Sequence, residues 1–101
     1  GQIVYLALMT VTDDDGLQPA LKVLRKAMSK LSDTISQSLR RGDVFTRFSV
    51  SQYLIMLPSA VLEDGEIVIK RIIKQFKREN PRVVVQIAYS LQPITPTDLE
   101  E

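Results

Sequence analysis

The sequence contains no cysteine, no histidine and no tryptophan. Without cysteine, the chain can form neither disulfides nor thiolate metal sites. Without histidine, it lacks the usual general base of enzymes and the commonest metal ligand of proteins. The composition therefore offers no recognisable catalytic centre, and we expect neither a metal nor a cofactor.

The sequence also lacks an excess of charge and a long apolar run. Its 13 Lys and Arg residues balance 12 Asp and Glu residues, giving a net charge of +1. No bulk field therefore steers the chain to nucleic acid or to a membrane. The longest apolar run, near Ile3–Met9, is far shorter than the roughly 20 residues that span a bilayer. The 101 residues suit one globular domain. Because the chain starts directly on a strand, we expect it to be a segment of a longer protein.

The first predicted element is a strand. Residues Ile3–Val11 form a continuous apolar run rich in strand formers, which predicts a central strand buried on both faces. Asp13–Gly16 follows and predicts a turn. Three carboxylates in this turn resemble a ligand set, but we interpret them as solvated side chains.

A long amphipathic helix is predicted next, with Pro19 in its first turn. Gly42 is its expected stop, with Arg40 and Arg41 placed near the carbonyl end, where cations are favoured. The apolar stripe recurs at steps of three and four and comprises Leu17, Leu21, Leu24, Met28, Leu31, Ile35 and Leu39.

Two strands then form a predicted hairpin. Val44–Phe48 alternates as a strand does, and Tyr53–Leu57 is a short apolar strand closed by Pro58. The connection Ser49–Gln52 contains no glycine or asparagine, so a tight two-residue type I′ turn is not expected.

The last two elements are a helix and a strand. Leu62 leads into a helix that Pro81 ends, and Ile69, Ile72, Ile73 and Phe76 form its apolar stripe. Val83–Leu91 alternates as the last strand, and Pro93, Pro96 and the acidic end read as a tail.

The predicted order is strand, helix, strand, strand, helix, strand. This order predicts an α+β fold of the ferredoxin-like βαββαβ type, an antiparallel sheet with both helices on one face. We expect a single domain over residues 1–95 and an acidic tail or linker over residues 96–101.

The stretch from Leu39 to Pro58, LRRGDVFTRFSVSQYLIMLP, resembles the central hairpin of GGDEF-type cyclase domains. Such domains share the βαββαβ plan and carry an LR..D...R run before the hairpin and a proline after it. The positions in step with that pattern are Leu39, Arg40, Asp43, Arg47, Phe48, Leu57 and Pro58.

The five signature positions of the cyclases are Ser49, Val50, Ser51, Gln52 and Tyr53 in this chain. The resemblance implies that the paired glycines, which let the backbone approach phosphates, are lost. The acidic pair that ligates Mg²⁺ is lost too, because Ser51 and Gln52 carry no charge. The metal-binding aspartate of the first strand aligns with Thr10–Thr12, and only Asp13–Gln18 stands where cyclases recognise the nucleotide. We therefore predict that the chain is not an enzyme.

Nearly the whole chain is similar to the C-terminal domain of bacterial transcriptional regulators of the SARP type that contain a bacterial transcriptional activator (BTAD) domain. The hairpin stretch, the later RIIKQF and the ending I-Y-S-L-Q-P carry this resemblance. It implies a catalytically dead, GGDEF-like accessory domain in the cytoplasm. The expected partners are other domains of the regulator and, in one version, a second copy of the chain. DNA would be bound only through another domain, and no membrane is involved.

Arg40 and Asp43 are the candidate ligand-binding residues. Arg40-Arg41-Gly42-Asp43 fits the R-x-x-D form of the inhibitory cyclic di-GMP site of GGDEF domains. Arginine can grip phosphate or a guanine edge in a bidentate manner, and aspartate can accept from guanine. The alternative function is therefore a small-ligand sensor, for cyclic di-GMP or, in an ACT-like mode, for an amino acid. The structural interpretation, which we favour, is that the arginines complement the helix end and Asp43 belongs to a turn.

Direct nucleic-acid binding is a minor alternative. A ferredoxin-like RNA binder needs stacking aromatic residues on its open sheet face. Only Phe45, Phe48 and Tyr53 come near such positions, and the sequence contains no RNP-type motif.

Overall fold

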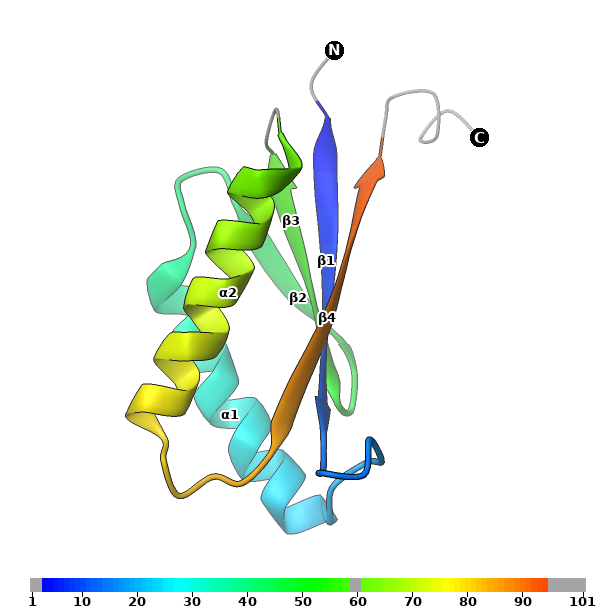
Figure 1. Cartoon of the computed structure of the whole chain (residues 1–101), viewed down its shortest axis with the longest axis vertical. Helices are drawn as coiled ribbons and strands as arrows, with labels where there is room; N and C mark the ends of the chain where they lie inside the picture. The colour runs from blue at the N-terminus through cyan, green and yellow to red at the C-terminus, as the bar shows by residue number, and fades with distance from the viewer. Residues whose placement is uncertain (1–2, 59–60, 95–101) are drawn as a thin grey trace.

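The computed structural model describes residues 3–58 and 61–94. Its elements follow the predicted order (Figure 1). They are β1 (Val4–Thr12), α1 (Leu21–Ser38), β2 (Val44–Ser49), β3 (Gln52–Pro58), α2 (Leu62–Glu79) and β4 (Gln86–Ile94).

The four strands form one sheet in the order β2-β3-β1-β4. Each neighbouring pair is antiparallel, and Ala7 of β1 stands between Ile55 of β3 and Leu91 of β4. Both helices lie on the same side of this sheet (Figure 1). The fold is therefore α+β and ferredoxin-like, as predicted.

The hydrophobic core lies between the helices and one face of the sheet. On β1, the residues that face the helices, such as Ala7 and Met9, are fully buried. The alternate residues, such as Leu6 and Leu8, are only half-buried. The prediction that this strand is buried on both faces is therefore wrong. No described element covers the second face, although several of its residues are apolar.

Helix α1 begins at Leu21 and ends at Ser38, inside the predicted limits. Leu17, predicted to start the apolar stripe, is 65% exposed and lies in the preceding loop. The loop holds it because the backbone N–H groups of Asp15 and Leu17 donate to Asp13 Oδ1 at 2.8 and 2.9 Å. This is the predicted turn, with Gly16 at φ +79°. Gly42 lies beyond the helix, so the predicted stop is four residues late.

The hairpin between β2 and β3 has a loop of only two residues, Val50 and Ser51, between the paired Ser49 and Gln52. No non-glycine residue in the described chain has a positive φ, which excludes a type I′ turn, as predicted. A register shift between Arg47 and Ser49 places a bulge beside the loop instead. Such a bulge increases the right-handed twist of the two strands, which a type I′ turn would otherwise match.

Helix α2 carries charges that complement its dipole. Glu63 and Asp64 lie in its first turn, and Lys77 and Arg78 lie in its last. Its buried Gly65 faces the sheet, where an added Cβ would lie 3.0 Å from a Leu91 methyl carbon. The missing side chain therefore lets the helix approach the sheet closely. No helix in the described ranges is long and apolar enough to cross a bilayer.

Strand β4 starts at Gln86 and runs to Ile94, three residues later at each end than predicted. Pro93 is therefore part of an edge strand, opposite Tyr5, and not of a tail. Proline is tolerated there because an edge strand has an unpaired side. The predicted tail, residues 96–101, lies outside the described residues.

We expect Ile72→Ala to lower the free energy of unfolding by about 2–5 kcal/mol, because it opens a cavity in the core. Ile72 is 0% exposed on α2. The matched control is Ile67→Ala on the same helix, where the side chain is 60% exposed. The control should change stability by less than about 0.5 kcal/mol. Urea unfolding followed by circular dichroism measures both, and equal losses would contradict the assigned core.

Candidate functional site

Arg40 and Asp43 form an ion pair with each other. Arg40 Nε donates to Asp43 Oδ2 at 2.9 Å, and Arg40 Nη2 donates to Asp43 Oδ1 at 3.2 Å. The Asp43 side chain is 2% exposed, whereas that of Arg40 is 34% exposed. The two residues therefore meet as the R-x-x-D hypothesis requires, but each uses its charged group on the other.

A tight turn creates this geometry. The Asp43 N–H donates to the Arg40 carbonyl at 3.0 Å, and Gly42 between them has φ +94°. Glycine adopts this positive φ without strain at the third position of a type II turn. The Arg40 N–H also donates to Asp43 Oδ2 at 2.8 Å, so the carboxylate closes the turn from inside.

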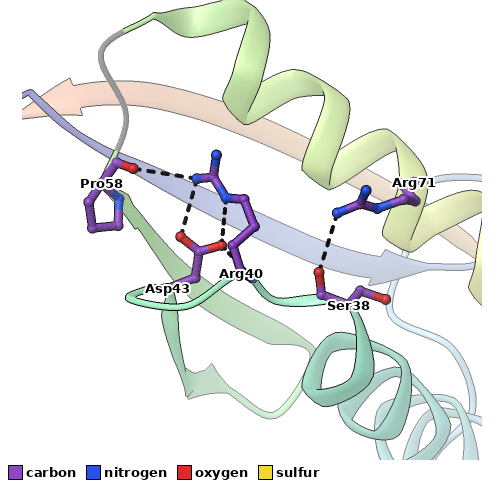
Figure 2. Close-up of polar contacts among 5 residues, drawn as sticks. All are labelled: Ser38, Arg40, Asp43, Pro58 and Arg71. Atoms are coloured by element: carbon purple, nitrogen blue, oxygen red, sulfur yellow. Dashed lines mark hydrogen bonds and ion pairs between the residues drawn. The ribbon is translucent and has the colours of Figure 1, made fainter.

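The pair also ties the turn to neighbouring elements. Arg40 Nη2 lies 3.5 Å from the carbonyl oxygen of Pro58 at the end of β3 (Figure 2). Beside it, Arg71 of α2 donates to the carbonyl oxygen of Ser38 at 3.5 Å, which places a cation at the end of α1. We call Arg40, Asp43 and the Pro58 carbonyl the arginine clamp. It fastens the α1–β2 turn to β3.

The electrostatics of the clamp favour a charged Arg40. The hydrogen bond to Asp43 raises the pKa of Arg40 above its ordinary value. The charges of Asp43 and Asp64 act in the same direction, and burial opposes them. A ligand that needs the Asp43 carboxylate would have to displace Arg40 from both oxygen atoms. Asp43 takes part in a turn, as predicted. Ligand binding by Arg40 and Asp43 stays a prediction.

The polar side chains around the β2–β3 hairpin loop are hydrogen-bonded to one another. Ser49 Oγ donates to Gln52 Oε1 at 2.8 Å, and the Ser51 N–H donates to Ser49 Oγ at 3.3 Å. Arg47 reaches round the loop and donates to the carbonyl oxygens of Ser49 and Val50. These side chains therefore stabilise the two-residue loop that lacks glycine.

Gln52 also joins the hairpin to the first strand. Its Nε2 donates to Thr10 Oγ1 at 3.0 Å. Thr10 and Gln52 are positions where the resemblance to cyclases predicts that metal ligands are lost, and this correspondence stays a prediction. The structure shows a neutral amide–hydroxyl hydrogen bond between the two side chains.

Tyr53 has a role that the sequence did not reveal. Its hydroxyl donates to the carbonyl oxygen of Met28 on α1 at 2.8 Å, and its side chain is buried. Its ring packs edge-on against Phe45, with centroids 5.8 Å apart. Both rings face the helices, so the expectation that they lie near the open sheet face is wrong. They are not available to stack on RNA bases.

The acidic residues do not converge. Within residues 3–58 and 61–94, no three Asp or Glu side chains are grouped as a metal site would require. Asp13 accepts the backbone N–H groups of its own turn, and Asp14 accepts from Gln86 Nε2 at 3.0 Å.

No protein-family model matches the sequence, and a search of curated proteins finds no match. Among solved structures, the chain is similar to the de novo designed protein Foldit4, with 9% identity and a TM-score of 0.45 over 94% of this chain and 100% of that chain. It is also similar to a mutant of SnoaB, a cofactor-independent oxygenase from Streptomyces nogalater. That match has 10% identity and a TM-score of 0.42 over 99% of this chain and 98% of that chain. Neither likeness bears on the function of this chain.

We expect Arg40→Ala to lower the free energy of unfolding by about 1–3 kcal/mol, because it leaves the buried Asp43 carboxylate without its charged partner. Arg41→Ala is the matched control, since Arg41 is exposed in the same turn. It should change stability by less than about 0.5 kcal/mol. Urea unfolding of both variants measures the difference. Equal stability of the two variants would show that the clamp contributes nothing.

Proposed function

We propose that this chain is a non-catalytic interaction domain of a cytoplasmic bacterial transcriptional regulator of the SARP/BTAD type. The observation that carries the proposal is the hydrogen bond between Thr10 and Gln52. Under the proposed resemblance to cyclases, Thr10 and Gln52 stand at positions that would ligate the metal, and the neutral bond between them supports a scaffold without this chemistry.

The other residues that match the cyclase pattern support the same proposal. Asp43 and Arg40 hold the α1–β2 turn, and Arg47 holds the hairpin loop. Each of these contacts contributes to stability, and none needs a nucleotide. In this chain the matched positions therefore have structural contacts that do not depend on catalysis.

Under this proposal, another domain of the regulator binds DNA. The strands of this chain contain a single charged residue, Arg47, whose guanidinium donates to the hairpin carbonyls. Neutralising DNA phosphates requires several Lys or Arg side chains on one surface. The sheet offers no such surface, and under this proposal the basic residues of the helices are solvated charge.

The proposal predicts two negative results for the isolated domain and one positive result for the longer protein. With GTP and Mg²⁺, the domain should form no cyclic di-GMP, as measured by liquid chromatography. It should not shift duplex DNA in a gel at low salt, where charge-driven binding is strongest. The regulator that contains it should shift its own promoter fragment.

An active cyclase domain, assayed in parallel, is the control for the chemistry. Turnover of GTP by this chain would overturn the non-catalytic assignment. A gel shift by the isolated domain that matches that of the longer protein would contradict the proposal that DNA is bound elsewhere.

A small-ligand sensor is the second candidate, and the exposure of about one third of the Arg40 side chain favours it. Calorimetry with cyclic di-GMP on the wild type, Arg40→Ala and Arg41→Ala tests it. We expect no heat of binding with any of them, because Asp43 is already paired. Heat with the wild type and Arg41→Ala that Arg40→Ala abolishes would establish the sensor instead.

A further inference from the structure

The side of the sheet opposite the helices is a continuous surface, which we call the open face. Its residues follow from the strand register, because paired residues of antiparallel strands point to the same side. Leu6 stands beside Met56 and Gln92, and Leu8 stands beside Leu54 and Ser90. The open face comprises Val4, Leu6, Leu8, Thr10 and Thr12 of β1, Val44, Thr46 and Ser49 of β2, Gln52, Leu54, Met56 and Pro58 of β3, and Gln86, Ala88, Ser90, Gln92 and Ile94 of β4.

The open face contains no charged residue. Charged residues make up 25% of the chain, yet the only one in the four strands is Arg47. Arg47 pairs with the buried Tyr53 and therefore belongs to the helix side. When one face of a sheet is exposed to water, apolar residues of the buried face normally alternate along each strand with polar or charged residues of the exposed face. A face without charge over four strands is therefore unusual for a permanently solvated surface.

The apolar residues gather at the middle of the open face. Leu6 and Leu8 of β1 and Leu54 and Met56 of β3 form adjacent cross-strand pairs on the two central strands. Met56 is 43% exposed, and Val44 beside it on β2 is 55% exposed. Neutral polar residues border these pairs on several sides, namely Thr10, Thr46, Gln52, Ser90 and Gln92, and the apolar residues Val4, Pro58 and Ile94 continue the surface at one end of the strands. An apolar centre with polar residues at its rim is the usual anatomy of a protein–protein interface.

The edges of the sheet are protected, in contrast to its open face. Strand β2 has six residues and a bulge near its end, and β4 contains Pro93. Short strands, bulges and proline are the devices that prevent strands from adding at an edge. Association of this domain is therefore directed away from the edges.

We infer that the open face is the interface of a homodimer, in which two copies pack their sheets face to face about a twofold axis. A twofold axis opposes the same surface in both copies, so a charge near the axis would meet its own copy. The complete absence of charge removes this repulsion, whereas a partner of opposite charge would find nothing to pair with. The inference goes beyond the function proposed above and does not depend on it.

The size of the open face suits a dimer of modest affinity. Four strands at ~4.8 Å spacing and ~3.3 Å per residue give a face of roughly 500 Å² in flat projection. Two such faces together give roughly 1,000 Å² in flat projection, close to the lower limit for a specific interface. We therefore expect a weak monomer–dimer equilibrium, with a dissociation constant between roughly micromolar and millimolar.

Sedimentation velocity from about 1 μM to about 1 mM covers the expected dissociation constant and tests the dimer. The wild type should pass from monomer to dimer in this range. Met56→Lys and Val44→Lys should each weaken the dimer at least about tenfold, because they bury an unpaired charge in the interface. Both positions are exposed in the monomer, and circular dichroism confirms that the variants fold.

Ile67→Lys is the matched control, because Ile67 is 60% exposed on α2. It should dimerise as the wild type does. The midpoint for the wild type should also change little with salt, because screening acts only on charges. A wild type that stays monomeric at the highest concentration overturns the inference and points to another domain as the occupant of the open face. The inference is also overturned if Ile67→Lys weakens the dimer, or if both strand variants leave the dimer intact. Dissociation of the dimer by high salt would likewise place the contact outside the open face.

Discussion

The structure depends on one constraint, which is that two helices can cover only one face of a four-stranded sheet. The apolar stripes of α1 and α2 bury Ala7, Met9, Ile55 and Leu57 on that face. Each fully buried large side chain contributes about 1.5–3 kcal/mol of transfer free energy. The same strands carry Leu6, Leu8, Leu54 and Met56 on the other side, where no described element packs. Packing of the core thus determines the fold, and it leaves an uncovered apolar face that a second copy of the chain can contact.

The polar residues act in support of this arrangement. The arginine clamp holds the turn that brings α1 back to the sheet, and Gln52 joins the hairpin to β1. Tyr53 joins β3 to α1 through the Met28 carbonyl. Buried polar groups are costly unless they are paired, so these contacts also fix one arrangement of the chain. Arg40, Asp43 and Gln52 thus each have a structural role in this fold.

Much of the fold could be predicted from periodicity, because both helices and all four strands carry regular apolar patterns. The errors have physical causes. An apolar run such as Ile3–Val11 looks the same whether its second face is covered or open. Leu17 continues the helical spacing, but the backbone bonds to Asp13 hold it in a turn. The R-x-x-D spacing fits both a ligand site and a closed turn; the structure shows the turn, with Gly42 at positive φ and Arg40 bound to Asp43 at two points, and ligand binding stays a prediction. The tyrosine–carbonyl bond joins residues 25 positions apart, which no local pattern reveals.

The central claim is that this domain uses its uncharged sheet face for association with a second copy of itself. Isotope-filtered nuclear Overhauser spectroscopy on a mixture of labelled and unlabelled chains tests it most directly, because it detects only contacts between copies. The account predicts intermolecular contacts among the methyl groups of Leu6, Leu8, Leu54 and Val44. Intermolecular contacts confined to the helices, or none at concentrations where the protein is dimeric by mass, would contradict it.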